Sequence, residues 1–108
     1  MDEQEFRTKA DTALDHLYRR LSAAADQYDF EPDFNAGALS IEFESPKARF
    51  VVSPQTPMRQ IWVSARSKSF KLDWDGEKQA FVLPETAQPL DEFIAFQISE
   101  HLGKPVNL

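Results

Sequence analysis

The spacing of the apolar residues changes near residue 28, and this change limits the folds open to the chain. From Phe6 to Ala24 apolar side chains recur every three or four residues, which is the period of a helix with one buried face. Asp2 and Glu5 form a capping box ahead of this run. We therefore predict one amphipathic helix from residue 3 to about residue 26.

A second helix is predicted near the other end of the chain. Pro89 suits its first turn, and Gly103 followed by Pro105 ends it. Its buried side is expected to carry Leu90, Phe93, Ile94, Ile98 and Leu102.

Between the helices, apolar residues alternate with polar ones, which is the period of a half-buried β-strand. The alternating segments are residues 28–34, 39–44, 48–53, 58–65, 69–74 and 79–83. Pro32 restricts the first of these to a sheet edge. The order of helix, five or six strands and helix predicts an α+β fold. It is a two-layer alpha/beta sandwich, with the N- and C-terminal helices packed on one face of a five- or six-stranded antiparallel sheet. The length predicts a single domain over residues 1–108.

This arrangement leaves one face of the sheet uncovered, and Trp62 is predicted to lie on it. Its strand neighbours Ile61 and Val63 point to the core, so Trp62 points away from it. The residues expected to share its surface are Gln60 and Ser64, with Gln55 in the preceding loop. Large aromatic residues often anchor protein interfaces, so this strand is a candidate partner-binding surface. The alternative is that strand twist or a covering loop buries Trp62.

The charge balance narrows the choice of partners. With 12 basic and 18 acidic residues the net charge is −6, which repels nucleic acid and anionic lipid. A basic protein patch or a metal cation suits this surface better. The chain has no Cys, which excludes thiolate ligation of a cluster. It shows neither a signal peptide nor a membrane-spanning run, so we expect a cytoplasmic protein.

Carboxylates are the main chemical feature of the sequence. They lie on the exposed stripe of the first helix, on the edge strand and across the following hairpin: Asp11, Asp15, Asp26, Asp29, Glu31, Asp33, Glu42 and Glu44. An ordinary solvated face is one interpretation. The functional interpretation is a binding site for the arginines of a partner or for a divalent cation such as ferrous iron or manganese. Exposed carboxylates that retain water favour weak, exchangeable binding.

Enzyme chemistry has little support in the sequence. His16 and His101 lie in different predicted helices and have no metal-ligand spacing, so both are expected to be surface or helix-end residues. The chain has only three Gly and no phosphate-binding loop, and no nucleophile triad can be recognised.

One motif resembles a known family. The run Gln55-Thr-Pro-x-x-Gln-Ile-Trp-Val-Ser64, followed by Asp73-Trp74 and an amphipathic helix, is similar to frataxin, whose bacterial form is CyaY. The likeness extends from Phe6 through Gly37-Ala-Leu-Ser-Ile to the end of the chain. It implies the same sandwich fold.

The resemblance also implies a function. It points to a cytoplasmic, non-catalytic iron chaperone of iron-sulfur cluster assembly that binds ferrous or ferric iron weakly, holds no cluster, and modulates a cysteine desulfurase and a scaffold protein. A monomer is expected, with iron-dependent oligomers as the alternative state. The implied metal sites are Asp11, Asp15, Asp26, Asp29, Glu31 and Asp33, and the implied partner contacts are Trp62, Gln60, Gln55, Ser64, Glu42 and Glu44.

One departure from the family pattern opens alternatives. Bacterial members place acids in the second half of the first helix, whereas this chain has Tyr18-Arg19-Arg20 there, so positive charge interrupts the acidic ridge. A metal-independent adaptor that docks a basic patch of a partner is therefore a second hypothesis. A ferroxidase that uses the carboxylates is a third.

Overall fold

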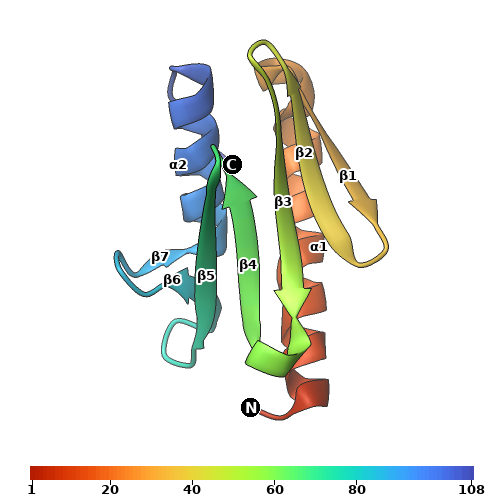
Figure 1. The fold of residues 1–108 in the computed structure, drawn as a ribbon, viewed down its shortest axis with the longest axis vertical. Helices are drawn as coiled ribbons and strands as arrows, with labels where there is room; N and C mark the ends of the chain where they lie inside the picture. The colour runs from red at the N-terminus through yellow and green to blue at the C-terminus, as the bar shows by residue number, and fades with distance from the viewer.

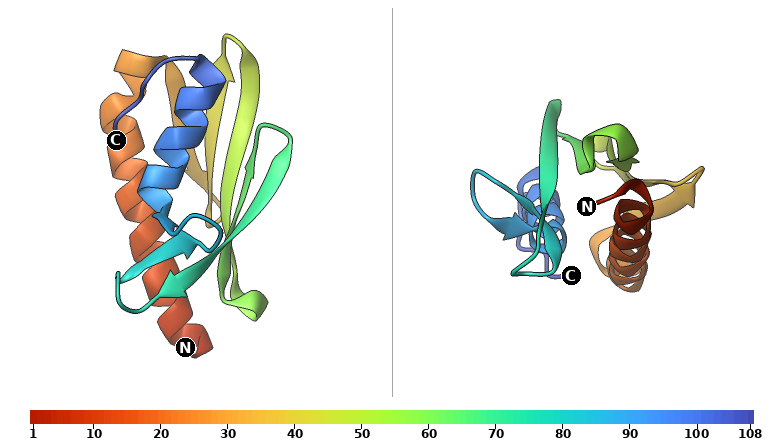
Figure 2. Two further views of the ribbon diagram at one scale, coloured as in Figure 1. Left: turned by 90° about the vertical axis from the view of Figure 1, so that its left-hand side faces the viewer. Right: turned by 90° about the horizontal axis from the view of Figure 1, so that it is seen from below.

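Two helices lie on one face of an antiparallel sheet in the computed structural model, which describes residues 1–108 (Figure 1). The helices are α1, Glu3–Tyr28, and α2, Leu90–Leu102. Seen from the side, both occupy one layer and the long strands occupy the other (Figure 2). Neither helix combines the length and the apolar composition that crossing a membrane requires.

Helix α1 begins where its capping residues predict. The Asp2 carboxylate accepts a hydrogen bond of 2.7 Å from the main-chain N–H of Glu5. The helix ends later than predicted, because Tyr28 is its last residue and Asp29 caps it in a left-handed conformation with φ of 62°. The expected strand start at Tyr28 and Asp29 is therefore wrong.

The sheet has seven strands in sequential order, each antiparallel to its neighbours, rather than the five or six predicted. The bounds are β1 Phe30–Asn35, β2 Ala38–Glu44, β3 Lys47–Gln55, β4 Gln60–Ala65, β5 Lys68–Asp75, β6 Ala80–Leu83 and β7 Gln88–Pro89. The additional strand is β7, in which Pro89 pairs with Val82 and Gln88 pairs with Leu83. A strand of two residues is too short to show alternation, so sequence periodicity could not predict it.

A short 3-10 helix, η1 Thr56–Met58, interrupts the chain between β3 and β4. Met58 was predicted to lie in the following strand, but it belongs to η1 and is 57% exposed. Arg59 ends η1 in a left-handed conformation, and its guanidinium donates hydrogen bonds to the main-chain oxygens of Thr56 and Met1.

The hydrophobic core lies between the helices and the sheet. It contains 23 buried residues, including the predicted inward set Leu39, Ile41 and Phe43 of β2. Phe6 of α1 contacts Phe81 of β6 edge to face, with 5.8 Å between ring centroids. This packing turns alternate residues of the long strands away from the helices.

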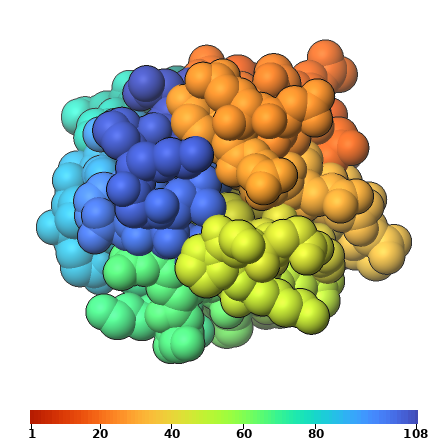
Figure 3. Space-filling view, turned by 90° about the horizontal axis from the view of Figure 1, so that it is seen from above, coloured from red at the N-terminus to blue at the C-terminus, as the bar shows by residue number.

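The residues that follow α2 return to α1. Val106 is 6% exposed and its main-chain N–H donates to Ser99 Oγ at 2.9 Å. The guanidinium of Arg20 in turn donates to the main-chain oxygen of Leu108 at 2.9 Å. Seen from above, this C-terminal segment lies against the end of α1 (Figure 3). It therefore links the ends of the two helices.

Candidate functional site

Four of the predicted metal-site residues lie where α1 passes into β1. We call this group the acidic corner: Asp26, Asp29, Glu31 and Asp33. All four are exposed, and none has a basic group within 4.0 Å. Their charges are therefore available to a cation or to a basic partner.

The other two predicted metal-site residues lie apart from the acidic corner. Asp11 precedes Asp26 by fifteen residues on α1, which at about 1.5 Å per residue separates them by roughly 22 Å along the axis. Asp15 is paired with Arg19, with Oδ2 of Asp15 and Nε of Arg19 3.0 Å apart. No group of three or more His, Asp or Glu side chains is arranged to hold a metal ion. A cation at this surface would therefore be held by few carboxylates and by water.

The two arginines that interrupt the acidic stripe act differently. Arg19 forms an exposed ion pair with Asp15. Arg20 points toward α2 instead, where its Nε lies 3.4 Å from Asp91 Oδ2. Only Arg19 therefore places positive charge among the predicted metal ligands of α1.

The acids of β2 lie next to basic residues of β3. Glu42 faces Glu31 on one side and Arg49 on the other, and Glu44 faces Lys47. Opposite charges directly across strands attract, so part of the negative charge of Glu42 and Glu44 is offset within the sheet.

Trp62 lies on the uncovered face of the sheet, as predicted, and it is half-buried rather than fully exposed. Its Nε1 donates to Gln60 Oε1 at 3.0 Å, and the amide nitrogen of Gln60 donates to Asp73 Oδ1 at 2.9 Å. The ammonium of Lys71 lies over the indole, 5.0 Å from the ring centroid. These contacts cover part of the ring and fix its orientation.

Two further predicted partner-binding residues, Gln55 and Ser64, lie near Trp62. Ser64 is exposed on the same strand. Gln55, predicted in a loop, is instead the last residue of β3, where it faces Gln60 and directs its amide nitrogen to Ser53 Oγ at 3.3 Å. A hollow of about 320 Å³ lies beside the indole. It is lined by Val51, Ser53, Trp62, Val63, Ser64, Ser69, Phe70 and Lys71.

Sequence reasoning missed Lys71 and Asp73. Both lie opposite predicted residues across the β4–β5 pair, Lys71 facing Trp62 and Asp73 facing Gln60. The pairing of Ala65 with Lys68 shows that the hairpin turn is only two residues long. A two-residue turn placed at Arg66 would have predicted both contacts, because loop length sets the register of a hairpin.

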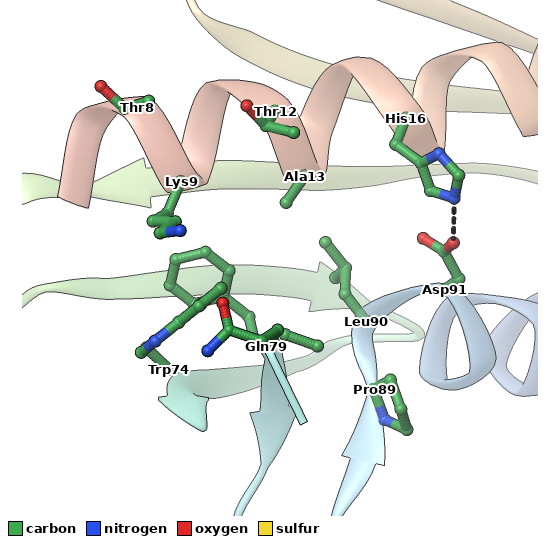
Figure 4. A pocket seen from close by; sticks show the side chains of 12 residues that line it. Thr8, Lys9, Thr12, Ala13, His16, Trp74, Gln79, Pro89, Leu90 and Asp91 are labelled. Atoms are coloured by element: carbon green, nitrogen blue, oxygen red, sulfur yellow. Dashed lines mark ion pairs between the residues drawn. The ribbon is translucent and has the colours of Figure 1, made fainter. Parts of the chain in front are cut away.

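A second cavity, of about 460 Å³, lies between α1, the start of α2 and strands β5 to β7, and no predicted site residue lines it. Lys9 of α1 extends over Trp74 at one end, with Nζ 5.2 Å from the ring centroid, and His16 meets Asp91 at the other end (Figure 4). Burial raises the pKa of Asp91, and the charges of His16 and Arg20 offset only part of this effect.

The two histidines have structural contacts. His16 Nε2 lies 2.9 Å from Arg20 Nε and 3.2 Å from Asp91 Oδ2, so it accepts from Arg20 when neutral and donates to Asp91 when protonated. His101, expected at the surface or at a helix end, lies in the last turn of α2 and is half-buried. Its ring packs 4.5 Å from that of Phe43, and its Nε2 lies 2.9 Å from the main-chain oxygen of Pro46.

Comparison with known protein families identifies a match over nearly the whole chain. The family model described as a frataxin-like domain matches residues 1–104. The chain belongs to the frataxin-like family. A mitochondrial frataxin of Arabidopsis thaliana is 29% identical over the whole chain, which spans 59% of that protein's length. The iron-sulfur cluster assembly protein CyaY of Cupriavidus metallidurans is 35% identical over 72% of the chain and 71% of its own length.

A solved structure agrees on the fold. The frataxin of Psychromonas ingrahamii aligns with a TM-score of 0.76, over 99% of this chain and 97% of that one, at 20% sequence identity. This confirms the frataxin-like arrangement of two helices on an antiparallel sheet. Within that fold, the acidic corner lies on α1 and β1 and the segment between them, and Trp62 lies on β4.

Proposed function

We propose that this frataxin-like protein is a non-catalytic, iron-binding regulator of iron-sulfur cluster assembly that acts in the cytoplasm as an iron chaperone. It modulates a cysteine desulfurase and a scaffold protein. The observation that carries the proposal is the acidic corner, where exposed carboxylates without ion-pair partners occur on a chain of this family. The name of the CyaY relatives, iron-sulfur cluster assembly protein, supports the pathway.

The acidic corner has two roles in this proposal. Its carboxylates bind a basic patch on the desulfurase, because charge complementarity gives specificity and speeds association. They also hold ferrous or ferric iron through one or two oxygens and water, which makes the metal weakly bound and exchangeable. Asp11 provides a further open carboxylate on α1, and Glu42 and Glu44 extend the docking surface onto β2.

The Trp62 surface is the second contact in this proposal and binds the scaffold. It lies on β4 in the middle of the sheet, whereas the acidic corner lies at the end of α1 and on the edge strand β1. Because the two surfaces are separate, one small protein can contact two members of an assembly complex at once.

A metal-independent adaptor is the alternative. It is favoured by the absence of any group of three potential ligands and by the pairing of Asp15 with Arg19. In this alternative the acidic corner binds only the basic patch of a partner.

An NMR titration distinguishes the two. Under anaerobic conditions, ferrous iron is expected to broaden the amide signals of Asp26, Asp29, Glu31 and Asp33. Desulfurase is expected to shift the same amides, and scaffold those around Trp62. If iron leaves the acidic corner unchanged while desulfurase still perturbs it, the adaptor is correct.

Charge reversal provides the matched test. The triple variant Asp29→Lys, Glu31→Lys and Asp33→Lys should lose desulfurase binding. A control with Glu77→Lys, Glu85→Lys and Glu100→Lys makes the same change in net charge at exposed positions elsewhere. Equal loss in both variants would show that net charge alone attracts the partner, and would count against a specific acidic corner.

A further inference from the structure

The cavity in Figure 4 has an apolar middle. Ala13 of α1 points into it, and Trp74 and Leu90 face α1 from the opposite side. Phe81, which is buried, completes this part of the lining. The volume of about 460 Å³ lies within the usual range of small-molecule sites. A molecule in this cavity would bury an apolar body, and a ring is favoured because Trp74 offers an aromatic surface.

One end of the cavity carries an unpaired positive charge. The ammonium of Lys9 lies 5.2 Å from the centroid of the Trp74 ring and forms no ion pair. Even Glu5, which precedes Lys9 by one helical turn, has no oxygen within 4.0 Å of it. A cation–π contact at a partly exposed site is weak, so a carboxylate that reaches Lys9 gains a stronger, charge-assisted interaction. This end therefore suits an anionic group.

The other end of the cavity carries the carboxyl of Asp91. Its Oδ2 lies 3.2 Å from His16 Nε2 and 3.4 Å from Arg20 Nε. The second oxygen takes part in neither contact and points toward the cavity (Figure 4). A hydroxyl both donates and accepts hydrogen bonds, so it can bond to this oxygen in either ionisation state of the carboxyl. A hydroxyl is thus the group that fits this end.

Spacing and charge limit the ligand further. Lys9 and His16 are seven residues apart on α1, so the two ends of the cavity are separated by roughly 10 Å along the helix. Lys9 is the only charged side chain of the lining without an ionic partner, and the chain has a net charge of −6. A ligand with one negative charge fits these conditions, whereas a polyphosphate would be repelled.

We propose that this cavity binds a small aromatic monocarboxylate. Its carboxylate pairs with Lys9, its ring lies against Trp74 and Leu90, and a hydroxyl at its far end bonds to Asp91. No residue of the acidic corner lines the cavity, and neither does Trp62. The site therefore goes beyond the proposed function, and its test requires neither iron nor a partner protein.

A titration with a defined probe tests the site. Para-hydroxyphenylpropionate is added at millimolar concentration, and the indole N–H of Trp74 and the amides of Lys9, Ala13 and Leu90 are followed by NMR. These signals are expected to shift together. The uncharged amide of the same acid should bind at least about tenfold more weakly, because it cannot form an ion pair with Lys9. Equal shifts with the acid and its amide, or no shifts around Trp74, would overturn the proposal.

Removing the hydroxyl from the probe tests the Asp91 end. Phenylpropionate keeps the carboxylate and the ring, so it should still shift the signals of Lys9 and Trp74. It should bind more weakly than the hydroxylated acid and leave the amide of Asp91 unchanged, because it has no group to bond to that carboxyl. If it binds as tightly and shifts Asp91 equally, the hydroxyl does not reach Asp91 and the proposed orientation is wrong.

Reversing the charge of Lys9 gives a stricter test. Lys9→Glu should lose the response to para-hydroxyphenylpropionate and respond instead to para-hydroxyphenylpropylamine, which carries the opposite charge on a similar skeleton. Lys104→Glu makes the same charge change at an exposed position outside the cavity and should behave as the wild type. A lysine with only a structural role would not exchange one ligand for the other. If both variants keep the response of the wild type, Lys9 does not hold the carboxylate.

Filling the cavity tests its apolar middle. Ala13→Leu places a larger side chain in the space for the ring and should remove most of the probe binding. Ala23→Leu makes the same substitution at an exposed position of α1 and should have no effect. An Ala13→Leu protein that keeps a folded NMR spectrum and binds the probe like the wild type contradicts the proposal. Dimerisation of the wild type in sedimentation, lost in Ala13→Leu, would assign the cavity to a second copy of the chain and exclude the small ligand.

Discussion

Asp91 is the residue whose ionisation the fold perturbs most clearly. Burial raises its pKa above the ordinary value of 3.8, so the folded protein binds its proton more tightly than the unfolded chain does. The stabilisation that comes from the protonated carboxyl is fully present below that ordinary value. It is lost as the pH rises through the raised pKa of the folded state.

The upward shift of the Asp91 pKa predicts how the stability of the fold depends on pH. Asp91→Asn removes the titrating group and keeps its shape. The free energy of unfolding of the variant, minus that of the wild type, should therefore increase from pH 3 to pH 6. Urea unfolding at several pH values measures it. Glu92→Gln, which removes a charge from the same turn at an exposed position, is the control. A difference that falls over the same range would contradict the prediction.

The residues around Trp62 show how far sequence reasoning reached. Alternation along one strand correctly placed Trp62 on the uncovered face. The covering by Lys71 and the hydrogen bonds through Gln60 depend on pairing between strands, which alternation alone does not specify. The sequence likewise shows which residues are acidic but not how far apart they lie. The separation of Asp11 from the acidic corner could be seen only in the structure.

Among the connections between elements, the two-residue turn between β4 and β5 has a strained backbone. Arg66 and Ser67 both adopt left-handed conformations, with φ of 53° and 64°. Two-residue hairpin turns of this kind favour Asn-Gly, because other residues place Cβ too close to the backbone. The chain thus has an unfavourable turn next to the strand that carries Trp62.

Relaxing this turn should stabilise the protein. The double variant Arg66→Asn and Ser67→Gly is expected to raise the free energy of unfolding by about 1–2 kcal/mol, as measured in urea. Ser69→Gly, in the adjoining strand, should instead lower it, because glycine weakens strand interiors. A double variant no more stable than the wild type would mean that the left-handed conformations at this turn carry little strain.

Helices and strands could be predicted from the sequence where their hydrophobic periodicity extended over enough residues. Helix α1 and strand β2 have many residues on one buried face, so their periods are clear. Strand β7 has two residues and pairs only through tertiary contacts, and the end of α1 depends on the left-handed conformation of Asp29. Such features arise from the assembled fold, which local periodicity does not encode.

At the scale of the whole molecule, the C-terminal segment joins the two helices. Val106 is buried in the hydrophobic core, and Arg20 donates a hydrogen bond to the main-chain oxygen of Leu108. This segment closes the gap between the C-terminal ends of the two helices.

Weakening this closure should destabilise the entire fold. Val106→Ala is expected to lower the free energy of unfolding by roughly 1–3 kcal/mol, because it removes buried methyl groups. Asn107→Ala, at an exposed neighbouring position, should change it by less than about 0.5 kcal/mol. Urea denaturation measures both, and similar values for the two variants would show that the segment contributes little to stability.

The two outermost strands, β1 and β7, each contain a proline, Pro32 and Pro89. A proline has no N–H to donate, so neither edge offers a complete row of donors to an incoming strand. The protein is thereby protected against edge-to-edge aggregation, even though one whole face of its sheet is uncovered. At high concentration it should remain dispersed, and β-strand addition by other chains is disfavoured at both edges.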